Sequence, residues 1–320
     1  MSHPVPIGFR AVTGNPRTVK VFNPTGKAQV TGRTLCQHLP APRFWLDAVG
    51  KPCKRAGATI REVKTIQLAP RIATGSAGTG KPPALVLRGV SVRLGGPAIL
   101  HDISIDIRER RIGIVGRNGS GKTTLARVIA GLQAPDGGTA QIDGTDMAKD
   151  RKAALRTVGI LFQNPDHQII FPTVEEEISF GLVQMGRKRD AATRETRKIL
   201  ERFGKSHWAG AATHALSQGQ KQLVCLMAVL AMRPAVIVLD EPYSGLDIPT
   251  RLQLMRFVDE VEASVIQITH DPASVRHFER VIWLDRGRIR QDGPAATVLA
   301  EFEGQMRNWG EQDDLSDLSG

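Results

Sequence analysis

One stretch, GRNGSGKTT at residues 116–124, constrains the fold more than any other part of the 320-residue sequence. It has the pattern GxxxxGK[ST], in which glycines let backbone N–H groups converge on phosphate oxygens while the lysine reaches the outer phosphates. An apolar run containing Ile112, Ile114 and Val115 comes directly before it, and LARVIAGL after it has helical periodicity. A strand, a tight glycine turn and a helix in this order predict a phosphate-binding loop.

A second stretch, GSAGTGKPP at residues 75–83, matches only the GxxxxGK part of the pattern. Pro82 stands where the hydroxyl residue should be, and Pro82 with Pro83 removes two N–H donors that a phosphate would need. No apolar run leads into this stretch. We therefore interpret residues 75–83 as a linker, which leaves one phosphate loop in the chain.

The excess of positive over negative charge lies in residues 1–84, about the first quarter of the chain. Lys and Arg outnumber Asp and Glu by 43 to 32, a net charge of +11 that by itself suggests a nucleic-acid partner. Residues 1–84 hold 13 basic and 2 acidic residues, whereas residues 85–320 hold 30 of each. The phosphate-loop domain is therefore neutral, and no nucleic acid is expected as a partner.

Residues 1–84 are rich in Pro, Gly, Thr and Arg, and their apolar periodicity is weak. A disordered basic extension is the favoured interpretation. A translated upstream region, with the true start near Leu85 or Val86, is the alternative, and the segment resembles a transit peptide only in its charge balance. The sequence thus divides into this extension, a phosphate-loop domain over 85–310 and an acidic tail over 311–320.

Cysteine content and hydropathy favour a reducing compartment and a chain without its own membrane span. Cys36, Cys53 and Cys225 are too few and too scattered for a disulfide framework or a zinc site. The longest apolar run, VCLMAVLAM, has nine residues, about half of the ~18 that a span requires. The N-terminus also lacks the apolar segment of a secretory signal.

From residue 85 onward the pattern predicts strands alternating with helices. Half-buried antiparallel strands are expected over 85–94 and 99–107, where apolar and polar residues alternate. The continuous apolar strands that follow imply a parallel sheet covered on both faces. Strands are expected over 157–163, 235–242, 264–271 and, as a pair, 280–289. Helices are expected over 173–186, 190–204, 220–232 and 251–261.

Two further motifs carry chemistry. Asp240 and Glu241 end a buried strand, where Asp240 can hold Mg²⁺ and Glu241 can deprotonate an attacking water. LSQGQ at residues 216–220 offers Ser217 as a helix cap and Gly219 beside it, which predicts a second anion site at a helix N-terminus. Since one nucleotide does not need two such helix ends from one chain, two chains that each lend one end to the other's nucleotide would use both.

These motifs, together with LFQNPD, SGLD and ITHD, occur in the order and spacing of an ABC-type ATPase, which the chain resembles over roughly residues 85–300. The resemblance implies an α/β P-loop NTPase fold of ABC type, with a mainly parallel sheet core, an antiparallel β subdomain and a helical subdomain. It also implies ATP hydrolysis with ATP and Mg²⁺ as cofactors. Two departures stand out: Gln218 replaces the first glycine of the family's LSGGQ, and Leu94 occupies the position of the usual adenine-stacking aromatic residue.

Matched position by position, the resemblance gives each motif residue an expected role. Catalytic roles fall on Glu241, His270 and Gln163. Metal ligation falls on Thr123, Gln163 and Asp240. Nucleotide binding falls on Gly116, Asn118, Gly119, Ser120, Gly121, Lys122, Thr123, Thr124, Ser217, Gly219, Gln220 and Asp247.

The segment FQNPDHQIIFPTVEEEISFG at residues 162–181 resembles the ATPases of energy-coupling factor importers, and the compact domain resembles the biotin-uptake type. Ile169, Ile170 and Phe171 are candidates for a docking groove, with an ordinary core role as the alternative. The resemblance implies a second ATPase subunit (a homodimer or a paralogue), a multispanning coupling protein, a substrate-binding membrane protein and a peripheral location at the cytoplasmic face of the inner membrane. Cobalt or nickel import is the alternative substrate class, and a soluble ABC ATPase acting on nucleic acid or ribosomes is the rival class.

Overall fold

A computed structural model describes residues 82–312 of the chain. The predictions for residues 75–83, 1–84 and 311–320 therefore fall almost wholly outside the described residues. Within residues 82–312, no helix combines the length and the apolar character that crossing a bilayer requires.

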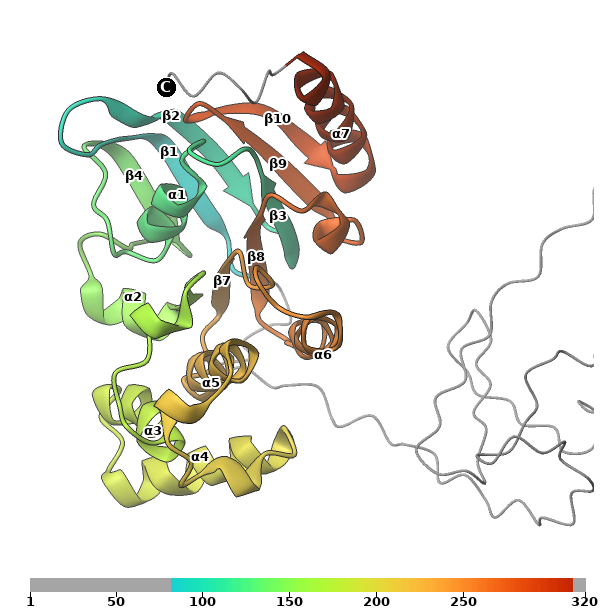
Figure 1. The fold of residues 1–320 in the computed structure, drawn as a ribbon. Coiled ribbons are helices and arrows are strands. Elements are labelled where there is room, and N and C mark those ends of the chain that lie inside the picture. Colours follow the sequence, from blue (N-terminus) through green and yellow to red (C-terminus); the bar gives the residue numbers. More distant parts are fainter. Residues whose placement is uncertain (1–81, 313–320) are drawn as a thin grey trace, which may run out of the picture. The chain divides into compact units, whose positions relative to one another are not determined.

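A six-stranded, mainly parallel sheet forms the centre of the fold (Figure 1). Its strand order is β10-β9-β3-β8-β7-β6, and every neighbouring pair is parallel except β9 with β10. The parallel core predicted from continuous apolar runs is confirmed, since every residue of β7 and β8 is buried. The strands are β3 (Arg111–Val115), β6 (Val158–Leu161), β7 (Val236–Asp240), β8 (Ser264–Thr269), β9 (Arg280–Asp285) and β10 (Arg288–Pro294).

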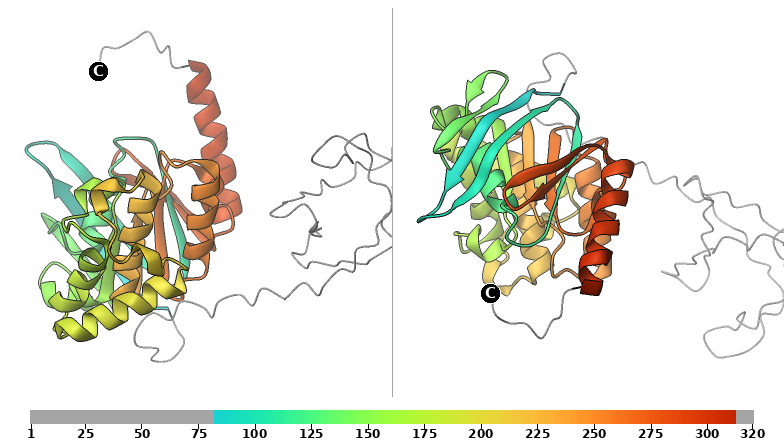
Figure 2. Two further views of the ribbon diagram at one scale, coloured as in Figure 1. Left: turned by 60° about the horizontal axis from the view of Figure 1, so that its bottom comes forward. Right: turned by 90° about the horizontal axis from the view of Figure 1, so that it is seen from above.

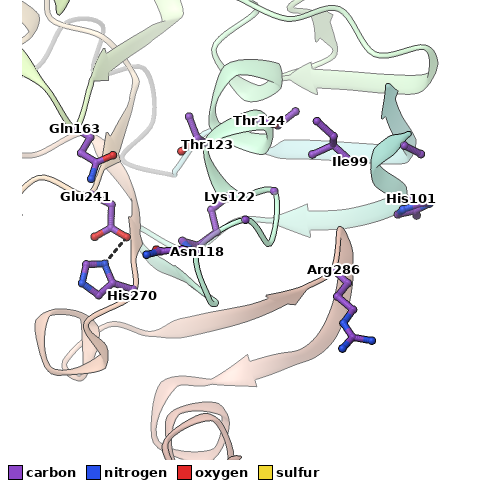
Figure 3. A pocket seen from close by; sticks show the side chains of 13 residues that line it. Ile99, His101, Asn118, Lys122, Thr123, Thr124, Gln163, Glu241, His270 and Arg286 are labelled. Atoms are coloured by element: carbon purple, nitrogen blue, oxygen red, sulfur yellow. Dashed lines mark hydrogen bonds and ion pairs between the residues drawn. The ribbon is translucent and has the colours of Figure 1, made fainter. Parts of the chain in front are cut away.

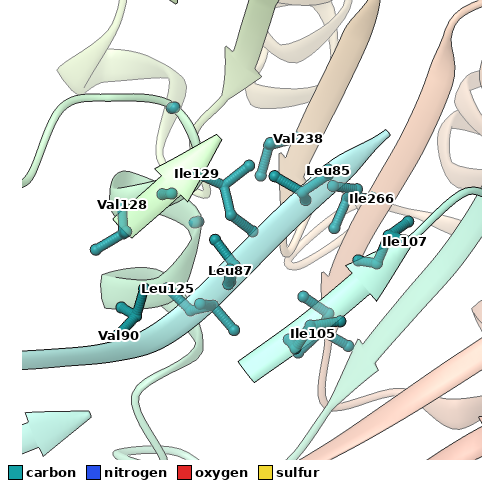
Figure 4. Close-up of a cluster of buried hydrophobic side chains, with 14 of the residues drawn as sticks. Leu85, Leu87, Val90, Ile105, Ile107, Leu125, Val128, Ile129, Val238 and Ile266 are labelled. Atoms are coloured by element: carbon teal, nitrogen blue, oxygen red, sulfur yellow. The ribbon is translucent and has the colours of Figure 1, made fainter. Parts of the chain in front are cut away.

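A second, antiparallel sheet lies over the helix that follows the phosphate loop. Its strand order is β2-β1-β4-β5. Leu85 and Leu87 of this sheet, Leu125 and Ile129 of the helix, and Val238 of the central sheet belong to one buried cluster (Figure 4), so the helix is packed between the two sheets. The elements are β1 (Leu85–Arg93), β2 (Ala98–Ile107), β4 (Gly137–Ile142), β5 (Thr145–Asp146) and the helix α1 (Lys122–Ile129).

The sequence predicts β1 and β2 but misses β4 and β5. In β4, GGTAQI, only Ala140 and Ile142 are buried, and its two leading glycines read as a turn. Pairing with β1 forms this strand, so its signal is tertiary contact rather than local pattern.

Helices α3, α4, α5 and α6 lie on the opposite face of the central sheet and form a separate helical layer (Figure 1). Helix α2 lies on the side of α1 instead, since its Ala154 belongs to the buried cluster that contains Leu125 and Ile129. α5 is mostly buried and packs against α3, α4 and α6 in one apolar cluster. The four helices predicted over 173–186, 190–204, 220–232 and 251–261 are confirmed. The helices are α2 (Arg151–Thr157), α3 (Val174–Gln184), α4 (Arg189–Arg202), α5 (Gln218–Ala231) and α6 (Ile248–Asp259), with short 3₁₀ helices at η1 (Pro165–His167), η2 (Ser206–Trp208), η3 (Thr213–Ala215) and η4 (Pro272–Val275).

A last helix, α7 (Ala295–Gln312), runs along the edge of the domain beside β9 and β10 (Figure 2). Its buried face contains Val298, Leu299 and Phe302, whose ring meets that of Trp283 on β9 with centroids 5.4 Å apart. This helix is not among those predicted from the sequence, although the spacing of these three residues is helical.

Candidate functional site

The turn between β3 and α1 forms a backbone cradle in which two of the glycines leave no room for a side chain. A Cβ on Gly116 would lie 2.2 Å from the carbonyl oxygen of Leu284, and one on Gly121 would lie 2.8 Å from a neighbouring side chain. Gly119 and Gly121 have φ of 78° and 97°, which glycine adopts with little strain. Since α1 begins at Lys122 without a side-chain cap, its first N–H groups and the positive end of its dipole are open to an anion.

The Lys122 ammonium lies inside this turn. Its Nζ donates to the carbonyl oxygens of Gly116 and Arg117, each at 2.8 Å, and the residue is only 7% exposed. Burial lowers the pKa of Lys122, while the nearby carboxylates of Glu241 and Asp240 raise it. A phosphate that enters the turn can replace the two carbonyl oxygens as the acceptor of this ammonium group.

Asp240, the last residue of β7, provides a buried carboxylate at the bottom of the site. It is 3% exposed, and its Oδ1 has no hydrogen-bond partner. Burial raises the pKa of Asp240, and a hydrogen bond with the Thr123 side chain lowers it. The unpaired Asp240 oxygen lies near the Thr123 hydroxyl, and Thr123 lines one cleft together with the Gln163 amide. Carboxylate, hydroxyl and amide oxygens form a ligand set that fits Mg²⁺.

Glu241 follows Asp240 in a strained conformation that aims its carboxylate at His270. Its φ is 48°, a value that costs a non-glycine residue on the order of 1–3 kcal/mol and that clusters at functional sites. Glu241 Oε1 lies 2.8 Å from His270 Nδ1 (Figure 3), and the Thr269 hydroxyl lies 3.4 Å from Oε2. A carboxylate held in this way can accept a proton from a water molecule.

Lys122, Glu241 and His270 line one cleft of about 800 Å³ at the carboxyl ends of the parallel strands. Figure 3 shows these side chains around it. Its size is that of an ordinary ligand pocket, and its position is where open α/β sheets bind ligands. The cleft is lined by most of the predicted site residues: Asn118, Gly119, Gly121, Lys122, Thr123, Thr124, Gln163, Glu241 and His270. Gly116, Ser120 and Asp240 belong to the same turn and strand end without lining the cleft.

The outer end of the cleft is lined by residues that were not predicted from the sequence. Ile99 and His101 of β2 line it together with Arg286, which lies in the turn between β9 and β10 (Figure 3). Main-chain hydrogen bonds dock this turn, since Gly287 N donates to Ser120 O at 3.0 Å and His101 N donates to Gly287 O at 2.9 Å. Only the fold brings these distant segments together, so no local pattern marks them.

Leu94 does not take part in the cleft. It lies in the turn between β1 and β2, is 43% exposed, and is absent from the residues that line the cleft. The apolar side chains that line the cleft on β2 are Ala98 and Ile99.

The predicted second anion site starts α5. Ser217 Oγ accepts from Gln220 N at 3.3 Å, and Gln220 Oε1 accepts from Ser217 N at 2.9 Å, which is a complete capping box. Gly219 packs so closely on α6 that a Cβ would lie 2.4 Å from Thr250 Cγ2. Asp247 caps α6 by accepting from Thr250 N at 2.8 Å, and the hydrogen bonds from Thr250 lower the pKa of Asp247.

This second group lies apart from the cleft. Ser217, Gly219 and Gln220 border a separate hollow of about 200 Å³ together with Trp208 and Thr250. In the described part of the chain, none of these residues lines the cleft of the phosphate loop. The fold therefore assembles the predicted residues into two groups, and a nucleotide-binding role for the second group stays a prediction.

The candidate docking residues differ in exposure. Ile170 is 66% exposed, whereas Ile169 packs against the helical cluster and the Phe171 ring lies 4.9 Å from that of Phe180. The Glu177 carboxylate fixes this segment by accepting from Ile170 N and Phe171 N, both at 2.9 Å. Ile169 and Phe171 thus have packing roles, and Ile170 is the one of the three whose side chain mainly faces outward.

Comparisons with known proteins agree with this architecture. The ABC transporter family matches residues 100–244. The biotin transport ATP-binding protein BioM of Rhodobacter capsulatus is 46% identical over 70% of this chain and 96% of its own length. The energy-coupling factor transporter ATP-binding protein EcfA1 of Lacticaseibacillus paracasei is 36% identical over 63% of this chain and 74% of its own length. The structure of cbiO1 from Clostridium perfringens, part of the ABC transporter complex cbiONQ, has a TM-score of 0.61 at 30% identity and covers 71% of this chain and 94% of cbiO1.

Proposed function

We propose that this chain, which belongs to the ABC transporter family of ATP-binding subunits, energises an energy-coupling factor importer that takes up biotin. The chain is an ATPase, and its relatives are ATP-binding subunits of transporters. The observation that carries the finer proposal is the 46% identity to a biotin transport ATP-binding protein over nearly all of that protein's length. Similarity to an energy-coupling factor ATPase supports the importer class.

In the proposed mechanism the phosphate loop binds the ATP phosphates and positions them. The N–H groups of residues 116–122 and the Lys122 ammonium offset the negative charge, so binding exchanges the Lys122 contacts to Gly116 O and Arg117 O for contacts to phosphate oxygens. Thr123, Asp240 and Gln163 would hold Mg²⁺. Bound there, Mg²⁺ would further neutralise the phosphate charge.

Glu241 then acts as the proton acceptor for the attacking water. Its carboxylate is poised by the 2.8 Å contact between Oε1 and His270 Nδ1, and its position is fixed by the main-chain bond from Glu241 N to Ile268 O at 2.9 Å. His270 lies at the mouth of the cleft with 54% of its side chain exposed, where it can also contact the outermost phosphate. Such proton transfer is typically worth ~10²–10⁴ in rate.

A second ATPase subunit completes each site in this proposal. Ser217, Gly219 and Gln220 form an anion-binding helix end that borders a different hollow from the one around Lys122. In a head-to-tail pair of chains, the helix end of each subunit can close the nucleotide site of the other. ATP binding would then draw the two subunits together, and hydrolysis would release them.

A membrane partner receives this motion. We place its docking contact at Ile170, because the Glu177 bonds hold the main chain of this segment rigidly while leaving that side chain 66% exposed. The partners would be a multispanning coupling protein and a substrate-binding membrane protein, with the ATPase peripheral at the cytoplasmic face of the inner membrane.

The test is uptake of labelled biotin, cobalt and nickel by cells that carry the chain with its membrane partners. We expect Ile170→Glu to reduce biotin uptake and co-purification of the coupling protein without changing the ATP turnover of the isolated subunit. Leu155→Glu is the matched control, because Leu155 is 45% exposed on α2 and has no proposed contact. Uptake of cobalt or nickel in place of biotin would contradict biotin as the transported molecule. The absence of any uptake would contradict the assignment to the importer class.

A further inference from the structure

The indole of Trp309, near the end of α7, contacts two arginines. The guanidinium carbon of Arg117, in the phosphate loop, is 5.1 Å from the ring centroid. The guanidinium carbon of Arg290, on β10, is 5.7 Å from the same centroid. Both distances are within the range of a cation–π contact, so one aromatic ring joins α7 to the loop and to the edge of the sheet.

The position of Trp309 is set by contacts on the side of the sheet. Arg290 also lies 4.4 Å from the ring centroid of Trp283, donates to Gln305 Oε1 at 3.3 Å, and pairs with Asp285 at 3.7 Å. Gln305 belongs to α7, one turn before Trp309. The helix is therefore fixed to β9 and β10 next to the ring that touches the loop.

On the side of the loop, the main chain of Arg117 holds the phosphate-binding lysine, Lys122. The Arg117 carbonyl accepts from Lys122 Nζ at 2.8 Å and from Ser120 N at 3.2 Å. The strand before the loop is tied to the same region, since Val115 pairs in register with Trp283. A contact that fixes the Arg117 side chain therefore limits the movement of the residue whose carbonyl binds both Lys122 and Ser120.

We infer that Trp309 is a positioning residue that holds Arg117, and through it the phosphate loop, in the conformation that receives ATP. This inference rests on the proposed role of the phosphate loop and does not depend on the transported molecule. It gives α7 a function in nucleotide binding that its place at the edge of the domain does not reveal.

The test is ATP affinity and turnover of the full chain carrying Trp309→Ala. We expect affinity to fall about two- to five-fold, the loss of one cation–π contact to the exposed Arg117 side chain, with turnover at saturating ATP unchanged. Trp309→Phe keeps an aromatic face and should restore most of the affinity. Asn308→Ala, an exposed neighbour on α7, is the matched control and should bind as the unaltered chain does.

A spectroscopic measurement decides the question even if Trp309→Ala does not fold. The difference in emission between the unaltered chain and Trp309→Phe isolates Trp309, and this signal should change on ATP titration with the half-saturation of binding. An unchanged signal, or unaltered affinity in Trp309→Ala, would overturn the inference. If Lys122→Ala also bound ATP normally, the proposed role of the loop itself would be contradicted, so the two failures are distinguishable.

Discussion

Replacing Glu241 by glutamine removes the proposed proton acceptor with little change in shape. In the unaltered chain, Glu241 Oε1 lies 2.8 Å from His270 Nδ1. The glutamine amide keeps an oxygen at this position, but it cannot take a proton from water. The substitution therefore separates the chemistry of the site from its structure.

Two energies can be worked out for this variant. Loss of general-base catalysis should lower turnover by ~10²–10⁴-fold, which is about 3–5 kcal/mol in the activation barrier. Stability should change far less. The hydrogen bond with His270 weakens by about 1 kcal/mol when its acceptor loses charge. Repulsion between Glu241 and Asp240, which contributes to the raised pKa of Asp240, is relieved at the same time.

The assays are ATP turnover at saturating ATP and Mg²⁺, equilibrium ATP binding, and thermal unfolding. We expect turnover to collapse, ATP affinity to be kept or increased, and gel filtration with ATP to show a stable dimer. Turnover near that of the unaltered chain would refute the role of Glu241. Loss of folding would refute the reasoning that the substitution is structurally mild.

Three further predictions concern other parts of the chain. Lys122→Ala should abolish ATP binding while circular dichroism shows an intact fold, because it removes the buried cation of the phosphate loop. Gly287→Ala should lower the free energy of unfolding in urea by about 1–3 kcal/mol and weaken ATP binding, because its Cβ would lie 2.0 Å from Ile99 O; Gly144→Ala, which has positive φ but no atom within 4 Å, should cost only about 1 kcal/mol. Deleting residues 1–84 should leave ATP turnover unchanged, and a large loss would show that the extension takes part in the activity.

The fold could be predicted where sequence pattern and burial coincide. The strands β7 and β8 are apolar along their whole length because both faces are covered, and α5 shows an unbroken apolar run for the same reason. β4 is not predicted from the sequence because two glycines and a threonine form its first half. α7 is not predicted because Gly304 and Gly310 lower its helix propensity. Packing of Phe302 on Trp283 stabilises this helix in the fold.

The candidate site could be predicted where motif residues are neighbours in sequence. The turn at residues 116–124 and the pair of Asp240 and Glu241 are local, so their spacing alone indicates their chemistry. The lining by His101 and Arg286 depends on the docking of one turn on another strand, which no local pattern encodes.

The central claim, that two chains share each nucleotide, can be tested by mixing variants. In the first mixture, the Lys122→Ala chain is combined with the Ser217→Ala chain, and each mixed dimer then keeps one intact site. In the second mixture, a chain carrying both substitutions is combined with the unaltered chain, and its mixed dimers keep no intact site. We predict that the first mixture regains turnover, up to about a quarter of that of the unaltered chain if pairing is random, although each variant alone is inactive. If each site lay within one chain, the first mixture would show no recovery. Turnover in the second mixture would then be proportional to the amount of unaltered chain. These two results together would contradict the account.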